Sequence, residues 1–230
     1  MAMRGLRVGL LHGLYQNGKV FAHKTQPLRA TLPGARIELE YFDGPHQVVP
    51  AVLSQSPRSQ RKQLKRKPTT DLAAFKGWWN PHHSDLATRT ETVETLQYLG
   101  TQLKRENVDG LVGFSQGGAL AALLCSDLAQ EIMDWSPAFV ICVCAYESKL
   151  PFHHEMIQSG IDPRIQSLHI GGKEDKVVTC RKSRELSLLF HDAEYVENDI
   201  GHVFPHDEAT LERIAAFVEQ LQLQLSISCP

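Results

Sequence analysis

The pentapeptide Gly-Phe-Ser-Gln-Gly at residues 113–117 constrains this chain more than any other feature. It follows a strand-like apolar run that ends at Val112, and it begins a run of small and apolar residues typical of a helix. A glycine on each side of Ser115 permits a very tight turn, because no Cβ atom keeps the strand and the helix apart. Such a turn presents the serine hydroxyl at a helix N-terminus, where free amides favour developing negative charge. The sequence therefore predicts an activated serine at position 115.

Composition limits the other possibilities. With 230 residues, 42% of them hydrophobic, the chain can bury a full core, and we expect one domain over residues 1–230. A formal charge of −2 gives no general attraction to nucleic acid or to acidic membranes. No run approaches the roughly 18 apolar residues of a membrane span, and the apolar stretch at 6–11 is too short for a signal peptide. The five cysteines are odd in number and lack a disulfide or zinc spacing, so we expect reduced core thiols and a cytoplasmic protein, with nuclear entry left open.

Short apolar runs alternate with longer amphipathic segments, which is typical of a mostly parallel sheet covered by helices on both faces. The predicted strands lie at 6–11, 37–42, 110–112, 139–145, 167–170 and 194–197. The predicted helices lie at 20–31, 85–106, 116–129, 179–190 and 207–224. The sequence thus indicates an α/β fold with a central sheet of about six strands.

Residues 54–70 differ from the rest because they carry six basic side chains and no acidic one. Clustered like charge resists packing, so we expect a mobile surface insertion there. Nuclear import or a patch for an anionic partner stays open, and an RNA-contacting arm is a weaker alternative. We expect no nucleic-acid partner from the remainder of the chain.

A serine hydroxyl needs a base to become a nucleophile, and the base needs an orienting carboxylate. Asp175 follows the predicted strand at 167–170, and His202 follows the predicted strand at 194–197, next to a glycine that allows a tight loop. The order serine, acid, histidine is the one that doubly wound hydrolases use. Glu174 and Asp199 are weaker candidates for the acid, and His206 is expected to belong to the final helix. The alternative for Ser115 is a structural turn or a phosphate loop, but the phosphate-loop motifs are absent.

The same model requires two amides to stabilise an oxyanion. We expect the backbone N–H of Gln116 and that of Leu14, or less favourably Tyr15, to form this hole. His12 is expected to be a buried, hydrogen-bonded loop residue rather than a second base.

Aromatic side chains near these positions suggest an apolar pocket for substrate. The adjacent Trp78 and Trp79 lie in a predicted loop, where they either anchor the core or line the substrate cleft. Tyr15, Phe114 and Phe204 complete the hypothetical pocket. We expect no cofactor and no metal site, since adjacent histidine pairs diverge and Cys142 and Cys144, expected on one strand face, lack further ligands.

Taken together, these motifs resemble the FSH-type serine hydrolases, a family of the α/β-hydrolase superfamily that includes fungal esterases and the ovarian-cancer-associated esterase of animals. The resemblance covers about residues 7–218 and rests on the segments 11–21, 43–46, 78–79, 113–118 and 201–205. It implies an α/β-hydrolase core without a large cap domain, a triad of Ser115, Asp175 and His202, and carboxylesterase activity on esters with apolar acyl chains. The insertion at 54–70 and the loop at 146–154 depart from the family pattern, so substrate choice is not carried over.

Two other functions stay open. The string G-F-S-Q-G-G also occurs in acyl-protein thioesterases, so the chain is alternatively an acyl thioesterase with the same triad. A catalytically silent hydrolase fold that binds a small ligand or a protein is the alternative from another class. The expected partner is a small ester or thioester, and the sequence does not predict the oligomeric state.

Overall fold

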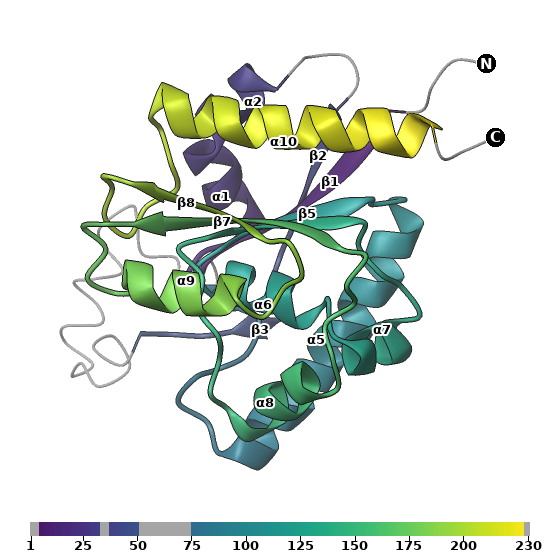
Figure 1. Cartoon of the computed structure of the whole chain (residues 1–230). Helices are drawn as coiled ribbons and strands as arrows, with labels where there is room; N and C mark the ends of the chain where they lie inside the picture. Colours follow the sequence, from purple (N-terminus) through teal and green to yellow (C-terminus); the bar gives the residue numbers. More distant parts are fainter. Residues whose placement is uncertain (1–4, 33–36, 51–74, 228–230) are drawn as a thin grey trace.

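A six-stranded, entirely parallel sheet forms the centre of the described chain. The computed structural model describes residues 5–32, 37–50 and 75–227 (Figure 1). In sheet order the strands are β2 (Ile37–Phe42), β1 (Leu6–Leu11), β5 (Gly110–Phe114), β6 (Phe139–Val143), β7 (Gln166–Gly172) and β8 (Glu194–Asn198). The predicted sheet of about six strands is confirmed, and all six carboxyl ends meet at one edge because every neighbouring pair is parallel.

Helices cover both faces of this sheet, as predicted. The helices α1 (Gly18–Lys24), α2 (Gln26–Thr31) and α10 (Glu208–Ile227) lie on the upper face in Figure 1. The lower face carries α5 (Asp85–Arg105), α6 (Gln116–Leu123) and α9 (Cys180–Ser187), with α7 (Asp127–Met133) and α8 (Pro151–Gln158) packed against α5. The predicted basic insertion at 54–70 and Cys229 lie outside the described residues.

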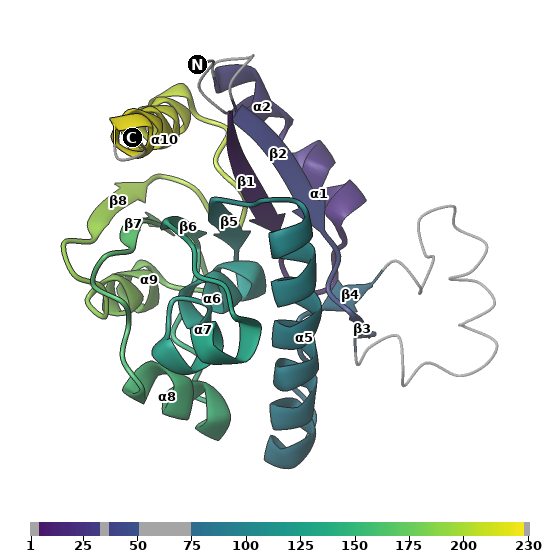
Figure 2. The same ribbon diagram turned by 90° about the vertical axis from the view of Figure 1, so that its right-hand side faces the viewer.

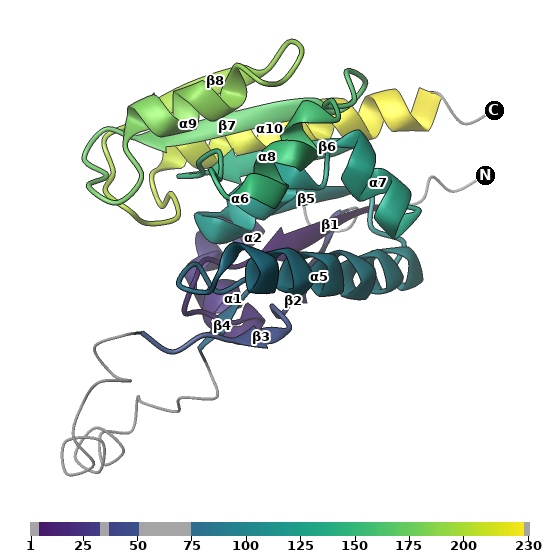
Figure 3. The same ribbon diagram turned by 90° about the horizontal axis from the view of Figure 1, so that it is seen from below.

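A small antiparallel pair lies apart from the main sheet and was not predicted. It consists of β3 (His46–Gln47) and β4 (Lys76–Gly77), and it lies beside α5 (Figures 2 and 3). The imidazole of His46 contacts α5 through the Glu91 carbonyl at 2.9 Å. The segment that follows this pair, Trp78-Trp79, is hydrogen-bonded to His12 and Gln116, which lie just beyond the carboxyl ends of β1 and β5.

Two predicted helices are each divided in two. The helix expected at 20–31 breaks at Thr25, because Pro27 in the first turn of α2 lacks an N–H and cannot continue a preceding helix. The helix expected at 116–129 ends at Leu123, and Ser126 begins α7 by accepting a hydrogen bond from the Ala129 amide. Serine is favoured at this capping position, so the second break also has a local cause.

The segment after β6 differs from its prediction as well. The strand expected at 139–145 ends at Val143, because Cys144 adopts a left-handed φ of 46° that no strand residue has. Cys142 and Cys144 therefore do not share a strand face, contrary to the prediction. The loop expected at 146–154 contains the start of α8, which begins with Pro151 and buries Phe152.

Two glycines allow α6 to pack directly against the strands. A Cβ atom on Gly113 would lie 2.3 Å from the Gly117 carbonyl oxygen, and one on Gly117 would lie 2.1 Å from the Leu11 carbonyl oxygen. Real Cβ atoms do not approach backbone oxygens this closely, so both positions require glycine. The glycines predicted to permit the tight turn thus serve a steric purpose at the junction of β1, β5 and α6.

We therefore expect Gly117→Ala to lower the free energy of unfolding by at least about 3 kcal/mol, the upper end of typical overpacking penalties. Gly201→Ala is the matched control, because its new Cβ would lie 3.8 Å from the nearest atom outside its neighbours. The control should change stability by less than about 1 kcal/mol. Urea denaturation of both variants measures this, and equal stability of the two would contradict the steric argument.

Three buried histidines are held neutral by the fold, and two of them, His153 and His169, lie away from the serine. Burial lowers the pKa of His169 to about 3 and that of His153 to about 4. His153 has partners on both ring nitrogens, Ser148 at 2.7 Å and Thr92 at 2.8 Å. His169 lies on β7 against the Phe190 ring, and neither of its ring nitrogens has a hydrogen-bond partner among the described residues. Protonation of His169 would place an uncompensated charge in the core.

The folded protein should consequently lose stability in mild acid. An unfolded histidine binds a proton near pH 6.5, whereas folded His169 does so only near pH 3, so the stabilisation is complete above about pH 6.5 and declines as the pH falls below it. His169 alone should cost about 2 kcal/mol between pH 7.5 and pH 5. His169→Leu should reduce this decline by that amount in denaturation curves at the two pH values. An unchanged decline would show that His169 is not its source.

Candidate active site

Ser115 lies in the turn between β5 and α6 and has a strained backbone. Its φ of 53° and ψ of −116° lie outside the regions that side chains usually adopt. The turn is held on both sides: the Ser115 amide donates to the Val143 carbonyl at 2.9 Å, and the Ser115 carbonyl accepts from the Ala119 amide at 2.9 Å. The predicted strand, serine and helix thus form the expected elbow, which projects the hydroxyl at the N-terminus of α6.

Asp175 and His202 lie beside this hydroxyl, as the sequence predicts. His202 Nε2 is 2.9 Å from Ser115 Oγ, and His202 Nδ1 is 2.7 Å from Asp175 Oδ2. A carboxylate only accepts hydrogen bonds, so Nδ1 carries the proton and Nε2 is left to accept from the serine hydroxyl. The imidazole is 21% exposed, whereas the carboxylate is fully buried. The three side chains form one continuous hydrogen-bonded chain from the interior to solvent.

The carboxylate of Asp175 is fixed before any substrate arrives. Its second oxygen, Oδ1, accepts from the amides of Val177 and Val178, each at 2.8 Å. The adjacent Glu174 is exposed, and Asp199 forms an ion pair with Lys173. The structure therefore brings Asp175, and neither of its two rivals, to the histidine.

A thiol that the sequence did not place here lies next to these groups. Cys144 Sγ and the nearest ligand atoms of Asp175 and His202 all lie within 4.8 Å of one another, the one cluster of at least three such side chains in the described part of the chain. Burial, and secondarily the charge of Asp175, raises the pKa of Cys144 to about 12. The thiol therefore stays protonated at neutral pH and is a poor nucleophile. Its left-handed backbone turns it toward Asp175, a conformation that strand periodicity could not indicate.

The two amides predicted for the oxyanion hole come from different elements, α6 and the loop after β1. Gln116 is the first residue of α6, where helix amides have no partner within the helix. Leu14 lies in the loop after β1, and the next amide, that of Tyr15, donates to the Lys76 carbonyl at 2.9 Å. Because the Tyr15 amide is occupied, the geometry favours Leu14 as the second donor.

His12 is fully buried behind this loop, as predicted. Its Nδ1 donates to the Gly13 carbonyl at 2.8 Å, and its Nε2 accepts from the Gly44 amide at 2.9 Å. Burial lowers the pKa of His12 to about 4, so the ring is neutral at physiological pH. These bonds favour the structural interpretation of His12 over a role as a second base.

Four of the five aromatic residues predicted to bind substrate are buried. The Phe114 ring packs against the His202 ring with 5.0 Å between the ring centroids, and the Phe204 ring packs against that of Phe21 with 5.7 Å between them. Trp78 and Trp79 are at most 1% exposed, which favours core anchoring over direct lining of a cleft. Tyr15 is partly exposed and its hydroxyl lies 3.3 Å from His82. Tyr15 is thus the member of this set best placed to touch a ligand.

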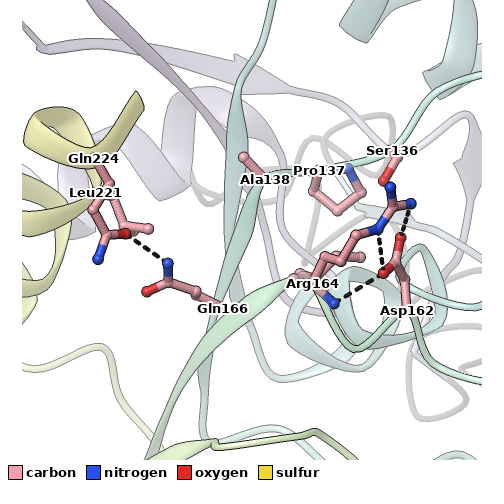
Figure 4. Close-up of a pocket in the computed structure, with 9 residues that line it drawn as sticks. Ser136, Pro137, Ala138, Asp162, Arg164, Gln166, Leu221 and Gln224 are labelled. Atoms are coloured by element: carbon pink, nitrogen blue, oxygen red, sulfur yellow. Dashed lines mark hydrogen bonds and ion pairs between the residues drawn. The ribbon is translucent and has the colours of Figure 1, made fainter. Parts of the chain in front are cut away.

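Apolar residues that the sequence argument missed flank the acid and the base. Val177 follows Asp175 by two positions and is 65% exposed, and Val203 directly follows His202 and is 51% exposed. Their proximity in sequence to Asp175 and His202 was the available signal. A surface hollow elsewhere, lined in part by the Asp162–Arg164 ion pair and by Gln166, lies at the amino ends of β6 and β7 (Figure 4). That end of the sheet is opposite to the edge that carries Ser115.

Among the described residues, no helix is both long enough and apolar enough to cross a membrane.

Comparisons with known proteins agree with the fold. A family model described as serine hydrolase (FSH1) matches residues 1–214. Esterase OVCA2 of Danio rerio is 30% identical over 230 residues, covering 94% of this chain and 98% of the relative, and the Homo sapiens protein of the same name is also 30% identical, with coverages of 95% and 98%.

Solved structures extend the comparison. Acyl-protein thioesterase 2 of Zea mays superposes with a TM-score of 0.65 at 17% identity, covering 96% of this chain and 95% of that one. A Bacillus cereus carboxylesterase superposes with a TM-score of 0.61 at 12% identity, with coverages of 94% and 88%. These likenesses confirm the predicted α/β-hydrolase fold. The match of the family model over most of the chain shows more: this chain belongs to the FSH1 family of serine hydrolases.

Proposed function

We propose that the protein is a serine carboxylesterase that hydrolyses small carboxylic esters through Ser115, His202 and Asp175. The observation that carries this proposal is the continuous chain from Ser115 Oγ to His202 Nε2 at 2.9 Å and from His202 Nδ1 to Asp175 Oδ2 at 2.7 Å. Membership of a serine hydrolase family and relatives named as esterases support it. A silent binding protein would have no need of this alignment.

In the acylation half of the reaction, Ser115 Oγ attacks the ester carbonyl and transfers its proton to His202 Nε2. Asp175 keeps the proton on Nδ1 and stabilises the imidazolium that forms. The carbonyl oxygen becomes an oxyanion, which accepts hydrogen bonds from the amides of Gln116 and Leu14. His202 then returns the proton to the leaving alcohol, and an acyl-Ser115 ester remains.

Deacylation repeats these steps with water. His202 Nε2 removes a proton from a water molecule, whose oxygen attacks the acyl carbonyl and passes through a second oxyanion. Collapse of that intermediate breaks the bond to Ser115 Oγ, which recovers its proton from His202. The products are a carboxylic acid and an alcohol, and the enzyme is unchanged.

An apolar acyl or alcohol group fits the surroundings of Ser115 best. The partly exposed Tyr15 lies next to the proposed donor Leu14, and the exposed side chains of Val177 and Val203 flank the acid and the base. Burial of these surfaces against a hydrocarbon chain would contribute roughly 25 cal/mol per Å². We therefore place apolar acyl esters ahead of highly charged ones.

A thioester is the second candidate substrate, because the same triad would expel a thiol. The Zea mays neighbour is named a thioesterase, but at 17% identity that likeness concerns the fold alone. Matched oxyesters and thioesters of equal acyl length, compared by kcat/KM, distinguish the two substrates. A preference for the oxyester supports the carboxylesterase proposal.

The assignment of the serine is tested with a fluorophosphonate probe, which labels only activated serines. Native protein should be labelled and should hydrolyse p-nitrophenyl butyrate, whereas Ser115→Ala should lose labelling and at least about 10³-fold in kcat. Ser136→Ala, at an exposed serine near the opposite end of the sheet, is the control and should behave as native. Normal turnover by folded Ser115→Ala would refute the proposal.

The role of the acid is tested separately. Asp175→Asn keeps the shape of the side chain but favours the opposite tautomer of His202, so kcat should fall by about 10³–10⁴-fold. Circular dichroism should show an intact fold. A kcat within tenfold of native would mean that Asp175 does not orient the histidine.

A further inference from the structure

The two proposed oxyanion donors, the backbone amides of Leu14 and Gln116, lie beyond the hydrogen-bonded ladder of the central sheet. The ladder therefore does not fix the distance between them. The last pair of residues in the β1–β5 ladder is Leu11 and Gly113. Leu14 lies three residues beyond that pair in the loop after β1, and Gln116 lies three residues beyond it in α6. Something other than the ladder must set the distance between the two amides, because an oxyanion requires both within hydrogen-bond reach.

The side chain of Gln116 is hydrogen-bonded at both ends to the Trp78-Trp79 segment. It is buried, its Oε1 accepts from the Trp78 amide at 3.1 Å, and its Nε2 donates to the Trp79 carbonyl at 2.9 Å. A backbone amide only donates and a carbonyl only accepts, so the orientation of the side-chain amide is fixed. The residue that carries one oxyanion donor is therefore tied at its other end to this segment.

Trp78 connects the same segment to the loop after β1. Its indole Nε1 donates to the His12 carbonyl at 2.8 Å, and its ring stacks on the His12 imidazole at 4.9 Å. His12 in turn holds the Gly13 carbonyl and the Gly44 amide. The two peptide groups immediately before Leu14 are thus held by Trp78, which bonds the His12 carbonyl, and by the His12 ring on which Trp78 stacks.

The segment also touches both donor residues directly and has its own anchor. Gly77, the residue directly before Trp78, lies next to both donor residues, since a Cβ atom on it would lie 3.0 Å from Leu14 Cδ1 and 3.2 Å from Gln116 Oε1. Thr95 of α5 donates its hydroxyl to the Trp78 carbonyl at 2.6 Å. A buried segment held by several hydrogen bonds is rigid and can transmit a fixed spacing.

From these contacts we infer that Trp78, with the Gln116 side chain, is a positioning element that sets the distance between the Leu14 and Gln116 amides. This inference rests on the proposed function, and it gives the tryptophan pair a role that neither core anchoring nor cleft lining describes. Trp78 touches no reacting atom and acts through the two donors. Loss of its indole N–H should weaken binding of the oxyanion more than binding of the ester.

Trp78→Phe removes the indole donor and keeps an aromatic ring against His12. With p-nitrophenyl butyrate, kcat should fall by about tenfold or more while KM changes by less than about twofold, because displaced donors affect mainly the transition state. An alkyl trifluoromethyl ketone mimics the transition state, because Ser115 Oγ adds to its carbonyl carbon and the carbonyl oxygen becomes an oxyanion in the hole. Its inhibition constant Ki should therefore rise by the same factor by which kcat falls. Gln116→Met, which removes both side-chain bonds but not the backbone amide, should give the same pattern if Trp78→Phe folds poorly.

Phe217→Leu is the control for a general loss of core packing. Phe217 is buried on the opposite face of the sheet, against Phe139 at 6.2 Å, so kcat and Ki should stay at native values. The inference fails if folded Trp78→Phe and Gln116→Met keep native kcat, if kcat falls without a rise in Ki, or if only KM rises. Its failure is distinct from that of the proposed function, because loss of labelling in Ser115→Ala does not depend on Trp78.

Discussion

The close packing of α6 against β1 and β5 is the constraint on which the rest of the structure depends. The Leu11 carbonyl leaves no space for a Cβ atom on Gly117, and the Gly117 carbonyl leaves none for a Cβ atom on Gly113. This contact forces Ser115 into its strained backbone conformation, which costs of order 1–3 kcal/mol. All residues of α6 are buried, so the surrounding core supplies the stability that keeps the turn in place.

Parallel strand order then brings distant loops to the same edge. The loops that carry Asp175 and His202 follow β7 and β8, and Cys144 follows β6. The carboxylate is held by two backbone amides and the imidazole by the carboxylate and the hydroxyl, so each group is oriented before a substrate binds. Preorganised polar groups of this kind do not need to rearrange during reaction, which is how such sites stabilise developing charge.

Several buried polar groups beneath the sheet make structural hydrogen bonds, to the backbone or to other side chains. His12 and His153 each have partners on both nitrogens, and the Gln116 amide is bonded at both ends. His169 differs because its nitrogens have no partner among the described residues. The imidazole of His202 is the one that joins a serine hydroxyl to a carboxylate in the described chain, and it is also partly open to solvent.

The sequence alone determined the α/β class and all six strands to within two residues at each end. It also pointed to the turn at Ser115 and to Asp175 and His202, which the structure places beside the serine hydroxyl. The fold predictions succeeded because glycine spacing and apolar periodicity are local properties, and the site residues were chosen by the equally local rule of position after a strand. The break between α1 and α2 at Thr25 could also have been predicted from the sequence, because Pro27 interrupts the segment expected to be one helix. Tertiary structure alone decided that β6 ends before Cys144, that both tryptophans are buried, and that hydrogen bonds join Gln116 to the tryptophan pair and Trp78 to the loop after β1. Those bonds link groups 37 to 66 residues apart, and no local pattern specifies which buried donor will meet which acceptor until the core has packed.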